Sequence, residues 1–256
     1  MIAVILQADI KRGNPRYNRE HLLELMKEGL KYNPDILILP EMWNTGYVEN
    51  IRELADQRGE PTVSLLASFA RDNEVNIAAG SISDLEGDQL FNRSYVFSSR
   101  GELITSYDKI HLFSLMEEDK NFTPGGKKAI FTLDDINWGL LICYDLRFPE
   151  LSRSLVEEGA EILIIVAHWP RSRIGAWRFL VGARAVENQV FALGVNRGGR
   201  EGDMSFGNSL VVDPAGNVIV EGGEEEALLK VEINRDIVTK ARKEIFYLQD
   251  RKPEAY

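Results

Sequence analysis

The sequence is poor in the residues that form disulfides and metal sites. It holds one cysteine in 256 residues, so no disulfide can form within the chain. One cysteine and three histidines also argue against zinc, because a structural zinc site usually takes four such ligands. No stretch approaches the roughly 20 apolar residues that a membrane-spanning helix needs, and no basic segment precedes the short apolar run at the N-terminus, as a signal peptide requires. With its free thiol, the chain is predicted to be cytoplasmic.

Positive charge is scarce as well. Lysine and arginine number 30 against 40 aspartates and glutamates, which gives a net charge of −10. This balance argues against nucleic acids and anionic membranes as partners, because both attract basic surfaces. The expected partner is therefore a small-molecule substrate. Linkers and low-complexity tracts are also lacking, so we expect a single domain over residues 1–256.

Short apolar runs alternate with longer helical patterns along the chain. Residues 2–8 and 36–39 are continuous apolar runs, typical of strands buried on both faces. The region 17–31 carries leucines and a methionine at helical spacing. The second half repeats this order, with strands expected at 138–142, 161–167 and 190–195 and helices at 148–158 and 174–188. Strands alternating with helices, and a hairpin expected near 208–220, predict an α/β fold with mixed sheets.

Three chemically suited residues follow predicted strands. Cys143 comes directly after one apolar run, Glu41 follows another, and Lys109 follows a third. The carboxyl ends of strands form the ligand crevice in open α/β sheets, so we expect all three on the same edge of one sheet. We also expect the helix after Cys143 to lower the pKa of its thiol. A carboxylate beside an apolar strand suits a general base, and a fixed ammonium suits an oxyanion.

Each of these residues also has an ordinary interpretation. Free cysteines are among the most buried residue types, so Cys143 could be an inert core thiol. Glu41 could cap a helix, and Lys109 could lie on the surface as most lysines do. The combination of nucleophile, acid and cation carries the functional hypothesis, not any one residue.

Four segments resemble the nitrilase (carbon–nitrogen hydrolase) superfamily, and the resemblance runs from Ile2 to about Arg242. The segments are Leu39-Pro40-Glu41, Tyr107-Asp108-Lys109-Ile110-His111-Leu112-Phe113, Cys143-Tyr144-Asp145-Leu146-Arg147-Phe148-Pro149-Glu150 and Ala183-Arg184-Ala185-Val186-Glu187-Asn188-Gln189. The resemblance implies a four-layer α-β-β-α sandwich with two mixed β-sheets. It also implies a Glu-Lys-Cys triad at Glu41, Lys109 and Cys143.

The same resemblance implies a second glutamate, before the segment Phe122-Thr123-Pro124-Gly125. The position falls on Glu118, although Glu117 and Asp119 are adjacent acids. The ordinary interpretation of this acidic cluster is a solvated loop.

These residues predict a mechanism without a metal or organic cofactor. Cys143 attacks an amide carbonyl, and Lys109 and the backbone N–H of Tyr144 hold the oxyanion, each good donor contributing about 3–4 kcal/mol. Glu41 takes the thiol proton, passes it to the leaving ammonia and then activates water to cleave the thioester. Glu118 holds Lys109 and binds the amide nitrogen.

Two alternatives to this mechanism remain. A Cys-His-acid triad could use His111 or His168, since such partners need not be close in sequence; structural imidazoles are the preferred interpretation. A homologue without catalytic activity could instead use Cys143 as a redox sensor, although an intact triad argues against it.

The segment after the cysteine resembles the ω-amidase branch of the family, which hydrolyses short 2-oxo acid amides such as 2-oxoglutaramate or 2-oxosuccinamate. Nitrile-hydrolysing members usually carry Cys-Trp-Glu, which this chain lacks. Deaminated glutathione and N-carbamoyl amino acids are the alternative substrates.

A carboxylate-bearing substrate needs a cation in the pocket. Arg147 is one candidate, and Arg171 and Arg173 are others. Arg147 could instead form a structural pair with Asp145 or Glu150. Four aromatic residues are candidates for the pocket walls: Tyr47, Phe113, Trp169 and Trp177.

Family members commonly form homodimers, which makes a homodimer or higher homo-oligomer the expectation here. The tail 244–256 carries apolar residues beyond the last expected helix, at 234–243. This composition suits packing on a partner, and the alternative is a frayed end.

Overall fold

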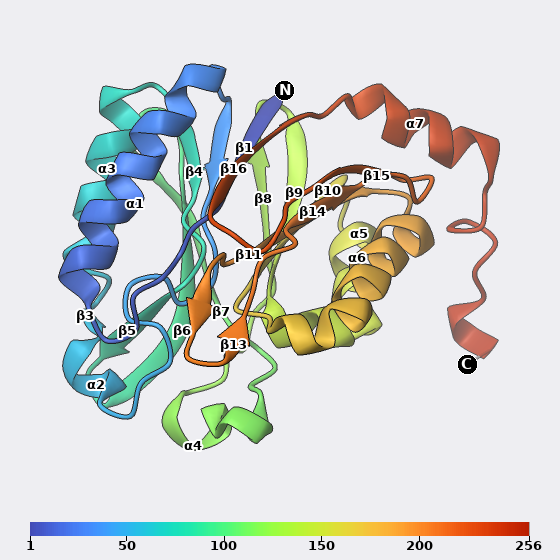
Figure 1. The fold of residues 1–256 in the computed structure, drawn as a ribbon. Coiled ribbons are helices and arrows are strands. Elements are labelled where there is room, and N and C mark those ends of the chain that lie inside the picture. The colour runs from blue at the N-terminus through green and yellow to red at the C-terminus, as the bar shows by residue number, and fades with distance from the viewer. Residues whose placement is uncertain (256) are drawn as a thin grey trace.

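Two mixed β-sheets pack face to face in the computed structural model, which describes residues 1–255 (Figure 1). The first sheet runs in the order β16 (Ala227–Glu232), β1 (Ile2–Gln7), β2 (Ile36–Ile38), β4 (Asn76–Ala78), β6 (Gln89–Phe97), β5 (Ile82–Glu86) and β3 (Asp56–Gln57), and β7 (Leu103–Asp108) also pairs with β6. Strands β1, β2 and β4 are parallel, whereas β16 and β6 join them antiparallel.

The second sheet has the same kind of parallel centre. Its order is β15 (Val218–Glu221), β14 (Leu210–Val212), β11 (Phe191–Asn196), β10 (Ile162–Ala167), β9 (Ile136–Ile142) and β8 (Ala129–Leu133). Strands β9, β10 and β11 are parallel, and β8 and β14 flank them antiparallel. A separate hairpin joins β12 (Arg200–Glu201) to β13 (Met204–Ser205).

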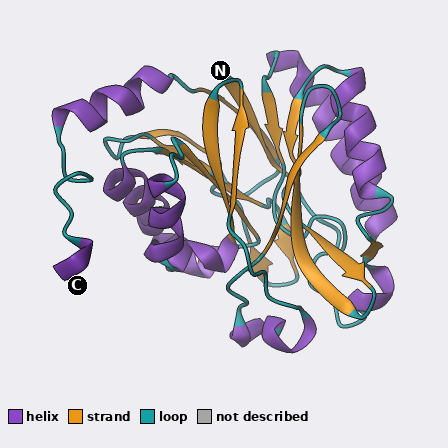
Figure 2. Ribbon diagram, turned by 180° about the vertical axis from the view of Figure 1, so that it is seen from behind, coloured by secondary structure: helices purple, strands orange, loops and turns teal. Residues whose placement is uncertain are grey.

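Helices cover the outer faces of both sheets. Helices α1 (Pro15–Gly29) and α3 (Thr62–Asp72) share one core with the first sheet, and α5 (Pro149–Glu157) and α6 (Ile174–Asn188) share another with the second sheet (Figure 2). The remaining helices are α2 (Ile51–Leu54), α4 (Glu118–Asn121) and α7 (Arg235–Glu244), and short 3₁₀ turns lie at Leu30–Tyr32, Ser114–Met116, Cys143–Arg147, Arg171–Arg173 and Pro253–Ala255. None of the helices within residues 1–255 has the length and apolar character needed to cross a membrane.

The two-sided burial of the central strands creates these layers. In β1, Ala3 and Ile5 face the core between the sheets, whereas Val4 and Leu6 face the helices. Alternate side chains of a strand point to opposite faces, so a continuous apolar run fills two cores at once. The same alternation occurs along β10. The predicted α-β-β-α sandwich is therefore confirmed, and so is the prediction that these apolar runs are buried on both faces.

The structure shows details that were not predicted from the sequence. Strand β8 was not expected, because Ala129–Leu133 is short and lies beside polar residues. The tail after α7 contacts its own chain: Arg251 pairs with Glu157 of α5, and the Tyr247 hydroxyl donates to Val186 O on α6. Residue 256 lies outside the described part of the tail.

Candidate active site

Glu41 lies in the loop that follows β2. The chain after Ile38 passes through Pro40, which ends the strand, and Pro40 O accepts a hydrogen bond from Ser81 N at 3.1 Å. A Cβ at Gly80 would lie 1.9 Å from Pro40 O, and Gly80 has a φ of 62°. Only glycine tolerates this close approach. These contacts hold the loop at Pro40 against the loop at Gly80 and Ser81. The Glu41 side chain is fully buried.

Lys109 and Glu118 come from the segment after β7. Lys109 N donates to Asn92 O at 2.9 Å, which continues the pairing of β7 with β6. Glu118 begins α4, and its Oε2 accepts from Phe113 N at 2.7 Å. The loop between these two residues therefore folds back, and it turns Glu118 toward Lys109.

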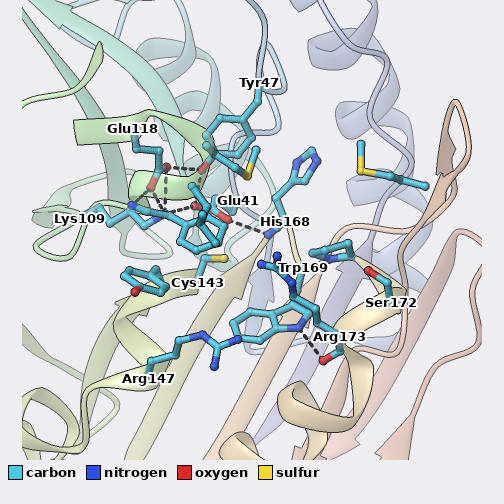
Figure 3. Close-up of a pocket in the computed structure, with 16 residues that line it drawn as sticks. Glu41, Tyr47, Lys109, Glu118, Cys143, Arg147, His168, Trp169, Ser172 and Arg173 are labelled. Atoms are coloured by element: carbon cyan, nitrogen blue, oxygen red, sulfur yellow. Dashed lines mark hydrogen bonds and ion pairs between the residues drawn. The ribbon is translucent and has the colours of Figure 1, made fainter. Parts of the chain in front are cut away.

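These three charged side chains form one buried cluster (Figure 3). Lys109 Nζ lies 2.9 Å from Glu41 Oε1 and 2.9 and 2.8 Å from the two carboxylate oxygens of Glu118. Their side chains are at most 1% exposed. Buried charges are tolerated only when they are paired and hydrogen-bonded. Glu117, by contrast, is exposed and pairs with Lys120, so Glu118 is the acid that contacts Lys109.

Cys143 follows the last residue of β9 and has a φ of 47°. Few residues other than glycine adopt this left-handed conformation, and such strain is common at functional sites. Asp145 fixes the turn that contains it. One Asp145 oxygen accepts from Ile142 N at 3.0 Å and from the Tyr107 hydroxyl at 2.7 Å, and the other accepts from His111 N at 3.0 Å.

Burial and the charges of neighbouring side chains shift the pKa values in the cluster. Burial alone would lower the pKa of Lys109, but the carboxylates of Glu41 and Glu118 outweigh it and raise that pKa. Burial would raise the pKa of Glu118, yet Lys109 brings it below its usual value. Burial, followed by the charge of Glu41, raises the pKa of Cys143 well above its usual value. The expectation that a helix N-terminus lowers the thiol pKa was therefore wrong: Cys143 enters a 3₁₀ turn, and α5 starts only at Pro149.

The two candidate histidines lie in different environments. His111 Nδ1 is 2.8 Å from Asp145 Oδ1, and its ring stacks on Phe148 with centroids 3.7 Å apart. His168 follows β10, and its backbone N–H, not its ring, donates to Glu41 Oε2 at 2.7 Å. The His168 ring packs edge-on against Tyr47 and Phe206. Burial, together with the charge of Arg197, lowers the pKa of His168 well below its usual value. A neutral, packed imidazole fits a structural role.

A cavity of about 390 Å³ opens in front of Cys143. All ten site residues expected from the sequence line it: Glu41, Tyr47, Lys109, Phe113, Glu118, Cys143, Tyr144, Arg147, Trp169 and Arg173. Two further candidates lie elsewhere. Arg171 pairs with Glu224 on the surface, and Trp177 is fully buried with its indole N–H donating to Asn208 O.

We expected these residues to meet at the edge of one sheet, and this expectation was wrong. Glu41 and Lys109 follow β2 and β7 of the first sheet, whereas Cys143 and His168 follow β9 and β10 of the second. Apolar runs give no sign of which sheet a strand joins. The facing of two sheets, not the edge of one, brings the acid, cation and thiol together.

The mouth of the cavity carries two arginines. The Arg147 guanidinium lies 4.8 Å from the Trp169 ring centroid, and the Arg173 guanidinium lies 5.5 Å from that of Phe113. Trp169 also donates from its indole N–H to Arg173 O at 3.0 Å. Within residues 1–255, neither guanidinium has a carboxylate partner within 4.0 Å. The structural pairing of Arg147 considered as an alternative is thus not found, and both cations are available to a ligand.

Sequence reasoning missed several residues around the site. Asn92 Nδ2 donates to Glu41 Oε1 at 2.9 Å from the middle of β6. Glu201 on the β12–β13 hairpin pairs with the fully buried Arg197 at 2.8 Å, and it lies 3.9 Å from His168 Nε2. Residues of ordinary type inside strands and hairpins carry no signal in the sequence that marks them. In the part of the chain described, no group of three or more His, Cys, Asp or Glu side chains is arranged to hold a metal.

Comparison with known proteins agrees with this geometry. The family model described as Carbon-nitrogen hydrolase matches residues 2–243. The chain is 38% identical over 253 residues to the 2-oxoglutaramate amidase of Bacillus subtilis (strain 168), covering 98% of this chain and 97% of that protein. XC1258 from Xanthomonas campestris, a CN-hydrolase superfamily protein with an arsenic adduct in its active site, superposes with a TM-score of 0.92 at 28% identity, over 98% and 97% of the two chains.

A third relative was solved with an amide bound. A cysteine-to-alanine mutant of the amidase from Nesterenkonia sp. AN1, in complex with butyramide, superposes with a TM-score of 0.86 at 27% identity, over 100% of this chain and 95% of that one. The αββα sandwich and these matches define the class: the chain belongs to the carbon–nitrogen hydrolase family of the nitrilase superfamily. It is an amidase-family enzyme.

Proposed function

We propose that this enzyme releases ammonia from the terminal amide of a small 2-oxo acid amide of the 2-oxoglutaramate or 2-oxosuccinamate type. The observation that carries the proposal is a pair of guanidinium groups, Arg147 and Arg173, at the mouth of a cavity that ends at Cys143. Neither has a carboxylate partner within residues 1–255. The similarity to a 2-oxoglutaramate amidase supports the same substrate class.

In this proposal Cys143 is the nucleophile and Glu41 is its base. The thiol proton passes to Glu41 as sulfur attacks the amide carbon, and the oxyanion is held by Lys109 and by the backbone N–H of Tyr144. The proton then moves from Glu41 to the leaving nitrogen, so ammonia departs and a thioester remains. Glu41 next takes a proton from water, which cleaves the thioester and restores the thiol.

Glu118 has a supporting role in this scheme. Lys109 Nζ makes three short contacts, and two of them are hydrogen bonds to the carboxylate oxygens of Glu118. Glu118 therefore fixes the ammonium beside Glu41. It lines the same cavity, where it is also placed to accept a hydrogen bond from the amide nitrogen. No step of this scheme needs a metal or an organic cofactor.

An ammonia-release assay tests the proposal. The panel contains 2-oxoglutaramate, 2-oxosuccinamate, butyramide, a nitrile, an N-carbamoyl amino acid and a deaminated-glutathione amide. We expect the highest kcat/KM with the 2-oxo acid amides, and loss of turnover by about 10⁴-fold or more in Cys143→Ala. A preference for one of the last two substrates would assign the alternative substrate class. Full activity of Cys143→Ala would refute the mechanism, and absence of turnover with every substrate would favour the redox sensor.

We further propose that residues 1–256 form one domain that assembles into a homodimer. The outer face of α6 exposes Phe179 at 77% and Val186 at 41%, and the nearby tail exposes Ile245 and Phe246. Large exposed apolar side chains grouped in this way are typical of interfaces. Sedimentation at several concentrations tests this, with Phe179→Asp expected to shift the protein toward the monomer.

A further inference from the structure

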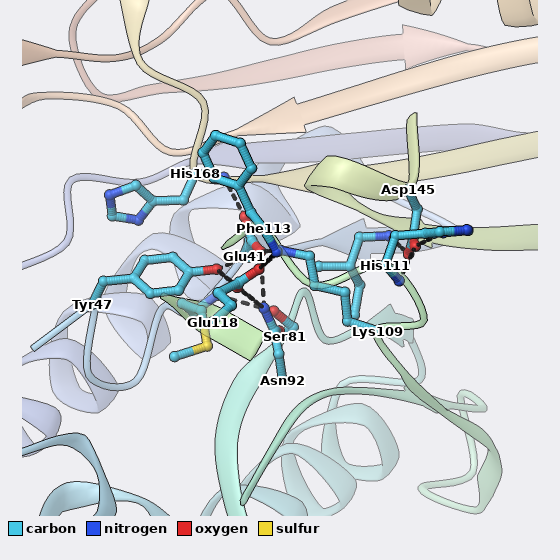
Figure 4. A network of polar contacts seen from close by, with 12 residues as sticks. Glu41, Tyr47, Ser81, Asn92, Lys109, His111, Phe113, Glu118, Asp145 and His168 are labelled. Carbon is cyan, nitrogen blue, oxygen red and sulfur yellow. Dashed lines mark hydrogen bonds and ion pairs between the residues drawn. The ribbon is translucent and has the colours of Figure 1, made fainter. Parts of the chain in front are cut away.

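Tyr47 was expected to be a wall of the pocket, but its hydroxyl reaches into the charged cluster (Figure 4). The oxygen lies 2.7 Å from Glu41 Oε1 and 2.5 Å from Glu118 Oε1. Asn92 Nδ2 lies 3.2 Å from the same oxygen and donates to it. One phenol oxygen therefore joins two carboxyl groups that Lys109 and the Asn92 amide also contact.

A count of protons shows what this geometry requires. A phenol has a single proton to donate, and an ionised carboxylate can only accept. If both glutamates were ionised, one of the two short oxygen–oxygen contacts would have no proton in it. Both contacts become hydrogen bonds when one carboxyl group is neutral and donates to the phenol oxygen, while the phenol donates to the other.

The surroundings decide which carboxyl group is the neutral one. Both carboxyl groups have donors besides Tyr47: Lys109 contacts both, Phe113 N donates to Glu118, and Asn92 and His168 N donate to Glu41. What separates them is that Lys109 holds the pKa of Glu118 below its usual value. Glu41 is the group that faces Cys143 in the cavity and receives its proton in the proposed mechanism. Glu118 is thus the permanent acceptor, and Glu41 is the donor whenever it carries the proton.

We propose that Tyr47 is a positioning residue that favours the state in which the proton has moved from Cys143 to Glu41. The S–H bond breaks, an O–H bond forms on Glu41, and the total charge of the cluster does not change. The new Glu41 O–H donates to Tyr47, and the Tyr47 O–H donates to Glu118. This inference rests on the proposed roles of Cys143 and Glu41 and explains how a thiol with a raised pKa becomes a thiolate.

The other groups that face this proton are accounted for. Lys109 stays charged, because the carboxylates raise its pKa. His168 stays neutral, and only its backbone N–H contacts Glu41. Asn92 does not titrate. The equilibrium that Tyr47 can bias is therefore the position of one proton, which lies on either Cys143 or Glu41.

The single cysteine allows a direct test without substrate. The rate of alkylation by iodoacetamide and the thiolate absorbance of the whole protein both report only on Cys143. Transfer of a proton within a pair does not depend on pH, so we expect a plateau of thiolate around neutral pH in the unmodified enzyme. In Tyr47→Phe the plateau falls about tenfold, the loss expected for one hydrogen bond to the protonated state, while the rate at high pH changes little.

A matched control is available at Tyr95. Its hydroxyl donates to the buried Asp84 carboxylate at 2.6 Å, outside the cavity, so Tyr95→Phe removes a similar bond and should leave the plateau unchanged. An unchanged plateau in Tyr47→Phe with a raised KM would mean that Tyr47 is only a pocket wall, and would overturn the inference.

A second measurement does not depend on the folding of that variant. In the unmodified enzyme, the infrared band of a neutral carboxylic acid should accompany the thiolate and disappear in Glu41→Gln. A single thiol titration well above neutral pH, with no such band, would also overturn the inference. Neither result depends on turnover, so failure of the amidase proposal would be seen separately, in the Cys143→Ala assay.

Discussion

The inner end and the mouth of the cavity use charge in opposite ways. At the inner end, Lys109, Glu41 and Glu118 are at most 1% exposed and contact one another at 2.8–2.9 Å. At the mouth, Arg147 and Arg173 are exposed and rest on aromatic rings without a carboxylate partner in residues 1–255. Paired buried charges are fixed in place, whereas unpaired exposed charges are free to bind. The inner end thus suits chemistry, and the mouth suits selection of the substrate.

Removing the central ammonium should have the largest effect. In Lys109→Met, two buried carboxylates lose their cation and the oxyanion loses a donor. We expect kcat to fall by about 10³-fold or more and the free energy of unfolding to fall by about 3–5 kcal/mol. Ammonia release and urea denaturation measure the two losses. The control Lys120→Met breaks the exposed pair with Glu117 and should change neither. Retention of kcat in Lys109→Met would contradict the assignment of the inner end.

The mouth should affect binding and spare the chemical step. In Arg147→Ala and in Arg173→Ala, we expect KM for a 2-oxo acid amide to rise about 10- to 100-fold, since a charge-assisted hydrogen bond contributes about 1.5–3 kcal/mol. Butyramide, which has no carboxylate, should be hydrolysed as before. Arg171→Ala is the matched control, because Arg171 pairs with Glu224 outside the cavity. If the arginine variants lost as much activity with butyramide as with the 2-oxo acid amide, the mouth would not select for the carboxylate.

The turn that carries the nucleophile should be moderately sensitive. Asp145→Asn replaces an oxygen that accepts from the surrounding donors with an amide that donates. We expect a loss of about 2–3 kcal/mol in stability, seen as a fall in Tm of roughly 4–10 °C, together with a lower kcat. Asp213→Asn, in an exposed turn, is the control and should change Tm little. A wild-type kcat in Asp145→Asn would show that this network does not hold Cys143.

The smallest effect concerns pH and His168. Its pKa is lowered in the folded protein, so below the ordinary value of about 6.5 the unfolded chain binds a proton that the folded chain does not. Stability should therefore fall as the pH drops below that value, by up to about 1.4 kcal/mol per pH unit from this group. His168→Gln should flatten the slope of unfolding free energy between pH 6.5 and 5. An unchanged slope in His168→Gln would contradict this account.

The sequence patterns alone predicted the buried strands, whereas the four layers and the Glu41, Lys109 and Cys143 triad came from the resemblance to the nitrilase superfamily. Continuous apolar runs such as residues 2–7 and 162–167 are buried on both faces, and this burial requires two cores per sheet. Residues that follow such runs lie at strand ends, where ligands bind. Strand position therefore predicted that Glu41, Lys109 and Cys143 would be near a crevice.

Only the tertiary structure decided how these residues meet and in which state. Strand patterns do not say which sheet a strand joins, and the acid and cation come from one sheet and the thiol from the other. The high pKa of Cys143, the bridge that Tyr47 makes between two carboxyl groups, and the contact of Arg147 with the Trp169 ring all depend on neighbours distant in sequence. Charge and proton position are set by burial and by contacts within a few ångströms, and those contacts exist only once the two sheets have packed together.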